Sequence, residues 1–334
     1  SLVRGRAVSS RAQVKAEPAP PAICRVHQGG DCPRGSGHPG RQAPGRASGL
    51  IKPSADRRLV RVGTENHSAL FGGKRLAVIA GPCVLESLEI TRRVAGEMRD
   101  VCARLNVPFV FKASYAKANR SAVESYRGPG LNAGLDMLAA IRCEFGVPVL
   151  TDVHDPGEAG TAGAVVDVLQ IPAFLSRQTA LIEAAARTGK VVNIKKGQFL
   201  APGDMEQAAE KASAAGAGGV LLTERGTTFG YGDLVVDMRS FAIMAATGWP
   251  TVFDVTHSLQ QPGGRVTGGR REFALPLARA AVAAGADAVF LETHPDPANA
   301  LSDAATMLPL AEAGQILESL VRVREALLVG ETWL

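Results

Sequence analysis

The sequence predicts a (β/α)8 barrel, because short apolar segments alternate with Ala-, Leu-, Glu- and Arg-rich segments of helical periodicity along most of the chain. Eight such pairs fit into roughly 265 residues, which is the number and size of unit that this fold requires. Polar residues also follow the apolar segments at the same phase of each unit. A doubly wound open sheet is the alternative, but no Gly-x-Gly-x-x-Gly motif follows the first predicted strand.

The predicted elements cover the chain from residue 76 onward. Continuous apolar runs are typical of strands that are buried on both faces, and they predict strands at 76–80, 109–113, 147–153, 166–171, 191–194, 219–223, 251–255 and 288–292. Helical periodicity ended by Gly or Asn predicts helices near 87–105, 131–145, 157–165, 177–188, 203–215, 235–247, 272–284 and 308–328. We therefore assign one barrel domain to residues 61–334.

Residues 1–60 have a different composition from the rest of the chain. They contain 8 Gly and 7 Pro, with 11 Lys and Arg but only 3 Asp and Glu, and they show no hydrophobic period. Such a segment cannot bury enough apolar surface to offset its ordering entropy, so we predict a disordered basic leader. A transit peptide, a disordered tail and mistranslated upstream sequence all fit this composition.

The overall charge and the cysteine content exclude several classes of protein. The net charge of +5 comes from the leader, since residues 61–334 hold 26 Lys and Arg against 29 Asp and Glu, and this argues against nucleic-acid binding. Five scattered cysteines are too few for a disulfide framework and favour a reducing compartment. No apolar run is long enough to span a membrane. We expect a cytoplasmic protein without a membrane partner.

Metal-ligand types follow the first, seventh and eighth predicted strands, which become neighbours when a barrel closes. These residues are Cys83, His257 and Glu292, and Asp303 in the loop after the eighth strand can supply a fourth ligand. Thiolate, imidazole and carboxylate groups suit a borderline divalent ion. No local Cys-x-x-Cys spacing supports the site, so a buried thiol beside a structural histidine stays open as the alternative.

Cationic residues follow the second, fifth and sixth predicted strands. Because the carboxyl ends of barrel strands meet at one rim, these charges should converge there. They would repel one another unless anions neutralised them, which favours two anionic groups over structural salt bridges. The cations are Lys112, Lys117, Arg120, Lys195 and Arg225. The Gly-rich segment 261–270 fits either a substrate-closing lid or an ordinary flexible loop.

Several motifs resemble the 3-deoxy-D-manno-octulosonate 8-phosphate synthase family, from about Val60 to near the C-terminus. They are Ala80-Gly-Pro-Cys-Val-Leu-Glu-Ser87, Lys117-Ala-Asn-Arg-Ser121, Arg127-Gly-Pro-Gly130, Thr151-Asp-Val-His154, the segment 170–179, Asn193-Ile-Lys-Lys-Gly-Gln-Phe199, Phe253-Asp-Val-Thr-His257 and Glu292-Thr-His-Pro-Asp-Pro297. The resemblance implies condensation of phosphoenolpyruvate with arabinose 5-phosphate and water, in the pathway to lipopolysaccharide.

The resemblance also implies roles for individual residues. Phosphoenolpyruvate would be bound by Lys117, Lys195, Arg225 and Gln170, with Lys112 close by. Arabinose 5-phosphate would be held by Asn119, Arg120, Ser121 and Asp152. Arg177 would reach the site of a neighbouring subunit in a homotetramer. The family contains a metal-dependent group with Cys at the position of Cys83, which implies Cys83, His257, Glu292 and Asp303 as ligands of Fe²⁺, Zn²⁺, Mn²⁺ or Co²⁺. Among these residues, we predict Lys117, His257, Cys83 and Asp303 as catalytic.

Two other functions stay open from the sequence. The related 3-deoxy-D-arabino-heptulosonate 7-phosphate synthases use erythrose 4-phosphate, but they resemble Lys-Pro-Arg-Thr where this chain has Lys117-Ala-Asn-Arg-Ser121. A non-catalytic phosphosugar-binding barrel would bind these ligands without releasing phosphate.

Overall fold

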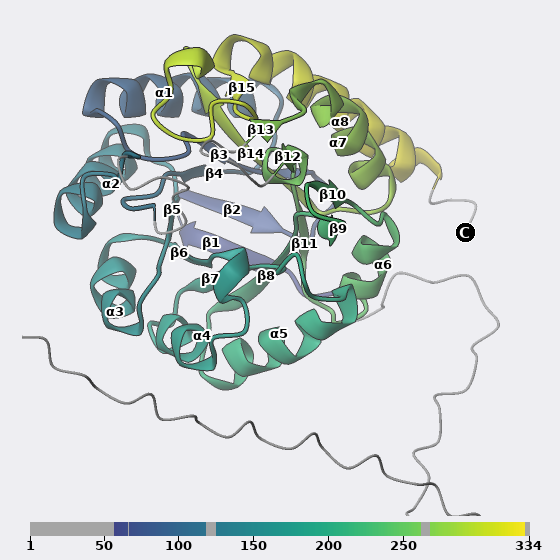
Figure 1. Ribbon diagram of the computed structural model, residues 1–334, viewed down its shortest axis with the longest axis horizontal. Coiled ribbons are helices and arrows are strands. Elements are labelled where there is room, and N and C mark those ends of the chain that lie inside the picture. The colour runs from purple at the N-terminus through teal and green to yellow at the C-terminus, as the bar shows by residue number, and fades with distance from the viewer. Residues whose placement is uncertain (1–56, 66, 118–124, 262–267, 331–334) are drawn as a thin grey trace, which may run out of the picture. The chain divides into compact units, whose positions relative to one another are not determined.

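A closed barrel of eight parallel strands is the centre of the molecule (Figure 1). The computed structural model describes residues 57–65, 67–117, 125–261 and 268–330. The barrel strands are β3 (Ala77–Gly81), β4 (Phe109–Lys112), β5 (Val149–Asp152), β6 (Val168–Ile171), β7 (Val191–Lys195), β8 (Gly219–Glu224), β11 (Thr251–Asp254) and β14 (Ala288–His294). Because β14 pairs with both β11 and β3, the ring of eight described strands is closed. The predicted barrel is confirmed, and the open-sheet alternative is wrong.

Eight α-helices surround the barrel and match the predicted helices closely. They are α1 (Leu88–Arg104), α2 (Leu131–Phe145), α3 (Pro156–Val165), α4 (Thr179–Ala186), α5 (Met205–Ala214), α6 (Arg239–Ala245), α7 (Ala274–Ala283) and α8 (Leu310–Gly330). Local signals set their ends. The Ser87 side chain accepts a hydrogen bond from the Ile90 amide and caps α1, and Gly146 takes a left-handed conformation after α2.

Shorter elements decorate the loops. Small strands are β9 (Thr227–Phe229), β10 (Asp233–Val235), β12 (Gln260–Gln261), β13 (Gly268–Gly269) and β15 (Leu308–Pro309). Single 3-10 turns are η1 (Ala173–Leu175), η2 (Pro202–Asp204), η3 (His257–Leu259), η4 (Arg271–Phe273) and η5 (Pro297–Asn299). Most of the predicted segment 261–270 lies outside the described residues, so neither interpretation of it is tested.

An N-terminal hairpin, which the sequence analysis missed, covers the amino-terminal end of the barrel. Strands β1 (Val60–Thr64) and β2 (His67–Phe71) pair antiparallel and cross the middle of the ring in Figure 1. Val60 and Phe71 are buried against inward-facing residues of the barrel strands. Arg57 Nη2 also donates a hydrogen bond of 2.5 Å to Asp287 Oδ2. The folded domain therefore begins a few residues before the predicted boundary at 61, and residues 1–56 lie outside the described part.

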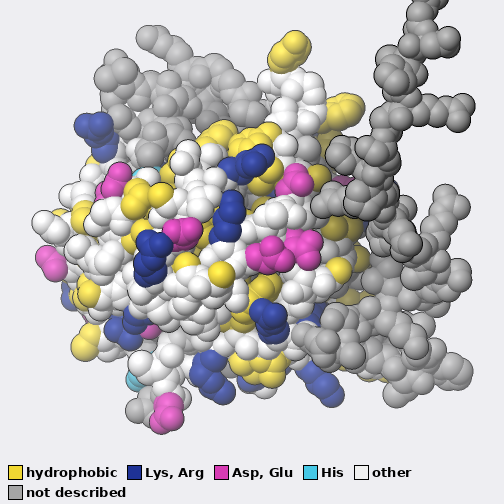
Figure 2. All heavy atoms as spheres, turned by 90° about the horizontal axis from the view of Figure 1, so that it is seen from below, with side chains coloured by type: hydrophobic (Ala, Val, Ile, Leu, Met, Phe, Trp, Pro, Cys, Tyr) yellow, Lys and Arg dark blue, Asp and Glu magenta, His cyan; other side chains and the backbone are white. Residues whose placement is uncertain are grey.

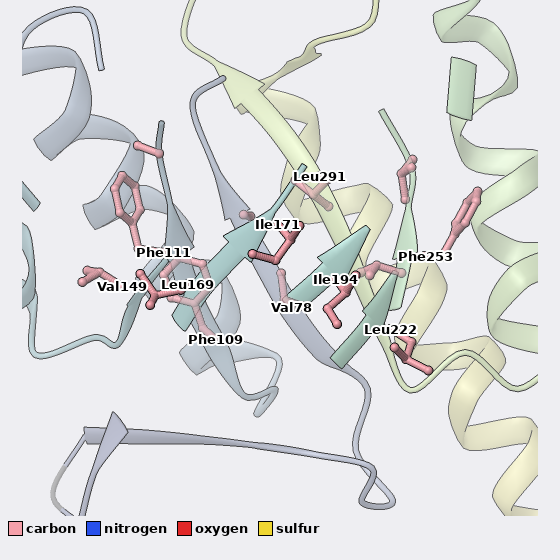
Figure 3. Packing of buried hydrophobic residues seen from close by; sticks show 14 of the residues in the cluster. Val78, Phe109, Phe111, Val149, Leu169, Ile171, Ile194, Leu222, Phe253 and Leu291 are labelled. Atoms are coloured by element: carbon pink, nitrogen blue, oxygen red, sulfur yellow. The ribbon is translucent and has the colours of Figure 1, made fainter. Parts of the chain in front are cut away.

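Side chains of the barrel strands alternate between two apolar clusters, as the pleat of a strand requires. Outward residues such as Val78, Phe111 and Leu169 pack beneath the helices (Figure 3). Inward residues fill the barrel together with the hairpin, and they include Ile79, Val110, Leu150, Val168, Leu221, Val252 and Phe290. The amino-terminal half of the barrel interior, called the lower half below, is therefore a packed apolar core.

The outer surface carries both signs of charge. On the side below the view of Figure 1, acidic and basic side chains lie interspersed with apolar ones (Figure 2). Among the helices that the structure describes, none is long and apolar enough to cross a membrane.

Candidate functional site

The candidate site begins two residues further along the barrel strands than the apolar core, toward their carboxyl ends. Because side chains on a strand alternate with a period of two, the residue two positions after each inward apolar residue also points into the barrel. These next positions are polar on seven strands and form a buried layer of Lys112, Asp152, Gln170, Asn193, Thr223, Asp254 and Glu292. The same strands thus supply an apolar core and, one step later, chemical groups.

The four predicted metal ligands lie together at the rim. Cys83 Sγ is 3.1 Å from Asp303 Oδ2, and ligand atoms of Cys83, Glu292 and Asp303 all lie within 4.8 Å of one another. His257 Nε2 faces the same point, at 3.5 Å from Glu292 Oε2 and 3.6 Å from Asp303 Oδ2. Barrel closure therefore assembles residues that are more than 200 positions apart in sequence.

His257 is oriented by Asp254. Its Nδ1 lies 2.9 Å from Asp254 Oδ2, and because a carboxylate only accepts, Nδ1 carries the shared proton. In the neutral ring the lone pair is then on Nε2, which faces the cluster, and a carboxylate behind the other ring nitrogen is the usual arrangement for a metal-ligating histidine. Burial lowers the pKa of His257, but Asp254 and Glu292 outweigh it and raise that pKa.

These residues fit a divalent cation. Glu292 Oε2 is buried and lacks a hydrogen-bond partner within the described part of the chain, although the group keeps its charge. Burial would raise the pKa of Glu292, but His257 and Lys112 lower it to about 2. Burial, Asp303 and Glu292 raise the pKa of the Cys83 thiol well above its usual range. A divalent ion would neutralise the carboxylate charge, and it would lower the pKa of the Cys83 thiol and so favour the thiolate.

Four cations line a cavity of about 300 Å³ beside this cluster. They are Lys112, Lys117, Lys195 and Arg225, and the lining also includes Asp152, His257, Glu292, Gln198 and the segment 172–175. Lys112 Nζ donates to Glu292 Oε1 at 2.5 Å and to the Cys83 carbonyl at 2.8 Å, so it joins the cavity to the cluster. The predicted convergence of cations is confirmed for these four residues.

The cavity retains capacity for anions. Asp254 Oδ2 accepts from Lys195 Nζ at 2.8 Å, and Arg225 Nη2 donates to Gln260 Oε1 at 2.7 Å. Arg225 Nη1 is buried and has no hydrogen-bond partner among the described residues. A buried guanidinium donor that is left unpaired is costly, and a phosphate or carboxylate oxygen would satisfy it.

Lys117 and Asp152 are both charged in this setting. Burial lowers the pKa of Lys117, but Cys83, Glu292 and Asp152 together raise it well above its ordinary value. Burial would raise the pKa of Asp152, whereas Lys112 and Lys117 hold it well below its usual range. The lining of the cavity thus includes both an ammonium group and a carboxylate acceptor.

Two of the predicted residues that the structure describes, Gln170 and Arg177, are not among the residues that line the cavity. Gln170 does not line it, because its amide donates to Asp152 Oδ1 at 2.5 Å and accepts from Asn193 at 2.8 Å. Arg177 is exposed between η1 and α4. The predicted sugar ligands Asn119, Arg120 and Ser121 lie outside the described residues.

Sequence reasoning missed several residues of the site. Asp254 supports both Lys195 and His257, and Gln198 lines the cavity. Gln260 links Arg225 to Asp303, where its Nε2 donates to Oδ1 at 3.3 Å. The alternation of side chains along β11 could have predicted Asp254, because this residue stands two positions after the inward Val252. Gln260 lies in a loop element without such a period.

Comparison with known proteins shows the family of the chain. The profile of the DAHP synthetase I family matches residues 60–329. A 2-dehydro-3-deoxyphosphooctonate aldolase of Azoarcus sp. (strain BH72) is 55% identical over 256 residues, covering 75% of this chain and 92% of the relative. Proteins of the same name from Desulfosudis oleivorans and Trichlorobacter lovleyi are each 53% identical, over 264 and 251 residues, covering 78% and 75% of this chain and 95% and 92% of those relatives. The chain therefore belongs to the DAHP synthetase I family, among its 2-dehydro-3-deoxyphosphooctonate aldolases, another name for the 3-deoxy-D-manno-octulosonate 8-phosphate synthases.

Proposed function

We propose that this protein condenses phosphoenolpyruvate with D-arabinose 5-phosphate and water to give 3-deoxy-D-manno-octulosonate 8-phosphate and phosphate, for lipopolysaccharide synthesis. The observation that carries the proposal is a four-cation cavity directly beside the cluster of Cys83, His257, Glu292 and Asp303. The curated relatives support the eight-carbon product over the heptulosonate alternative, since their name specifies an octonate.

Phosphoenolpyruvate is assigned to the cationic side of the cavity. Lys117, Lys195 and Arg225 supply positive charge for its phosphate and carboxylate, and Arg225 Nη1 is available for an oxygen of either group. We assign Gln170 to holding Asp152 rather than to direct contact, because its amide is already bonded inside the barrel. Fixed cations bind the anion and stabilise charge that shifts onto the leaving phosphate.

Arabinose 5-phosphate is assigned to the side of Asp152, with Asn119, Arg120 and Ser121 completing its site as the family motif implies. Carbon 3 of phosphoenolpyruvate then forms a bond to the aldehyde carbon of the sugar, water adds at carbon 2, and the carbon–oxygen bond to phosphate breaks. Holding the weakly nucleophilic carbon 3 against the aldehyde supplies much of the rate enhancement, about 7–11 kcal/mol at best for such positioning.

A divalent ion is assigned to Cys83, His257, Glu292 and Asp303. Fe²⁺, Zn²⁺, Mn²⁺ and Co²⁺ all accept this donor set. When bound, such an ion would polarise the aldehyde or lower the pKa of the attacking water. Lys112 and Asp254 serve the same site by fixing Glu292 and His257.

We further assign the protein to the cytoplasm as a homotetramer. Arg177 is exposed on the loop after β6, close in sequence to the cavity residues 172–175, which suits a contact with a neighbouring subunit's site. Phe174 and Phe199 on adjacent loops expose about three fifths of their surface, at 59% and 58%. Exposed aromatic side chains of this kind are enriched at interfaces.

An assay of phosphate release tests the function directly. Phosphoenolpyruvate should release phosphate with arabinose 5-phosphate and far more slowly with erythrose 4-phosphate. Faster turnover of the four-carbon sugar would contradict the octonate assignment. Binding of both substrates with no phosphate release, in protein supplied with Mn²⁺ or Co²⁺, would instead support a non-catalytic barrel.

A further inference from the structure

The loop that carries Asp303 is held in an unfavourable backbone conformation. Asp303 has φ of 49°, in the left-handed region that side chains other than glycine rarely adopt. Its carbonyl accepts hydrogen bonds from the amides of Thr306 and Met307, so the turn is closed on its C-terminal side. A left-handed residue costs roughly 1–3 kcal/mol and persists only where its surroundings impose it. The N-terminal side of the turn has a separate anchor at Leu301.

Glu86 provides that anchor from the loop after β3. Its Oε1 accepts a hydrogen bond of 2.9 Å from the Leu301 amide, across 215 positions of sequence. Glu86 stands three residues after Cys83, and Leu301 stands two residues before Asp303. This single bond therefore joins the two ligand-bearing loops next to the point where Cys83 Sγ meets Asp303 Oδ2.

His294, at the end of β14, lies beside the second carboxylate oxygen of Glu86. The Asp296 amide donates to His294 Nδ1 at 3.0 Å, so in the neutral ring the proton is on Nε2. Nε2 lies 3.5 Å from Glu86 Oε2 and makes no hydrogen bond within the described part of the chain. The side chains of His294 and Glu86 are only 4% and 7% exposed, so water screens this contact poorly. Both carboxylate oxygens of Glu86 thus have a defined neighbour.

We propose that Glu86 is a positioning residue for the metal site: it holds Asp303 in ligating position against Cys83 through its hydrogen bond to the Leu301 amide. The inference rests on the metal site of the proposed function. Glu86 is not itself one of the clustered ligand atoms. Its contribution is to pre-form the distance between Cys83 and Asp303, which lie on two different loops. Supporting residues of this kind typically change metal affinity by about 10- to 100-fold.

Titration of the metal-stripped protein with Co²⁺ tests this role without any activity measurement. Absorption bands of Co²⁺ report thiolate coordination and the geometry of the remaining ligands. Glu86→Ala should weaken Co²⁺ binding about 10- to 100-fold and change the band shape, because Asp303 is displaced. Glu86→Gln, which keeps an acceptor for Leu301, should weaken binding only about 2- to 10-fold. Glu89→Ala, an exposed glutamate three residues further along, is the matched control and should bind like wild type.

The outcomes separate this role from the metal site itself. Equal affinity and identical bands for wild type and Glu86→Ala would overturn the positioning role alone. If Glu86→Ala does not fold, Glu86→Gln decides, and an unchanged affinity in that variant would overturn the role. Failure of the wild-type protein to bind Co²⁺ would overturn the metal site and this role with it.

Discussion

The lower and upper halves of the barrel interior are built by the same strands and yet have opposite chemistry. Below, Val110, Leu150 and Val252 meet the hairpin in an apolar core. Above, at the next inward positions, Lys112, Asp152 and Asp254 form charged contacts. A shift of two residues along a strand thus changes the environment from one that stabilises the fold to one that binds charge.

The comparison also explains how so many buried charges are tolerated. Isolated buried charges are very costly, but each charged side chain of the upper half has an opposite charge or a hydrogen bond nearby, as Lys195 has in Asp254. The rigid core below holds these partners in place. We therefore expect mutations below to change stability, and mutations of the residues above that line the cavity or the metal cluster to change catalysis.

The largest expected effect lies in the lower half. Phe71→Ala removes a fully buried ring from the hairpin and should lower the free energy of unfolding by about 3–5 kcal/mol. Chemical denaturation measures this loss, and kcat of the folded protein at low temperature should stay unchanged. Leu59→Ala, at an exposed position beside the hairpin, is the control. A large loss of kcat in the folded Phe71 variant would break the division between the halves.

The second effect lies at the metal cluster. Cys83→Ala should reduce kcat/KM by more than about 100-fold, because even residues that only support metal ligands cost up to that much. Chelation should abolish wild-type activity, and Mn²⁺, Fe²⁺ or Co²⁺ should restore it, whereas none should restore the variant. Cys143→Ala, at an exposed cysteine, serves as the control. Full activity of exhaustively chelated wild-type protein would contradict a metal-dependent reaction.

A smaller effect is expected at the cationic wall. Arg225→Leu removes charged hydrogen bonds worth about 1.5–3 kcal/mol, so kcat/KM for phosphoenolpyruvate should fall about 10- to 100-fold. Steady-state kinetics with each substrate varied in turn should show the larger KM increase for phosphoenolpyruvate. Arg239→Leu, on the exposed surface of α6, should behave like wild type. An increase confined to the KM of the sugar would move Arg225 to the other subsite.

The smallest effect is expected at Thr223, in the buried polar layer between the apolar core and the cavity. Thr223 Oγ1 donates to Asn193 Oδ1 at 2.6 Å, and Asn193 in turn donates to Gln170. Thr223→Val keeps the shape but leaves the Asn193 oxygen unpaired, which should lower stability by about 1–2 kcal/mol with little change in the KM of phosphoenolpyruvate. Thermal unfolding measures it, with the exposed Thr228→Val as control. An effect on KM as large as that of Arg225→Leu would place this buried chain in the binding site.

Much of the barrel was predictable because its signals are local. Each strand and helix has its own apolar period, and the helix ends have their own caps, such as Ser87. The hairpin was missed although Val60 and Val62 alternate with polar residues, because its strands are short and adjoin the Gly- and Pro-rich leader. The alternation of side chains along a strand also predicts that Asp254 faces into the barrel, because it stands two positions after the inward Val252.

The sequence by itself determined the fold and the residue types at the rim, because apolar periodicity and the phase of polar residues are encoded within each unit. Only the tertiary structure decided which of those residues meet. Cys83 and Asp303 are 220 positions apart, and their contact depends on barrel closure and on a left-handed turn that has no period in the sequence. The bond from Leu301 to Glu86 is decided in the same way, because it joins two irregular loops.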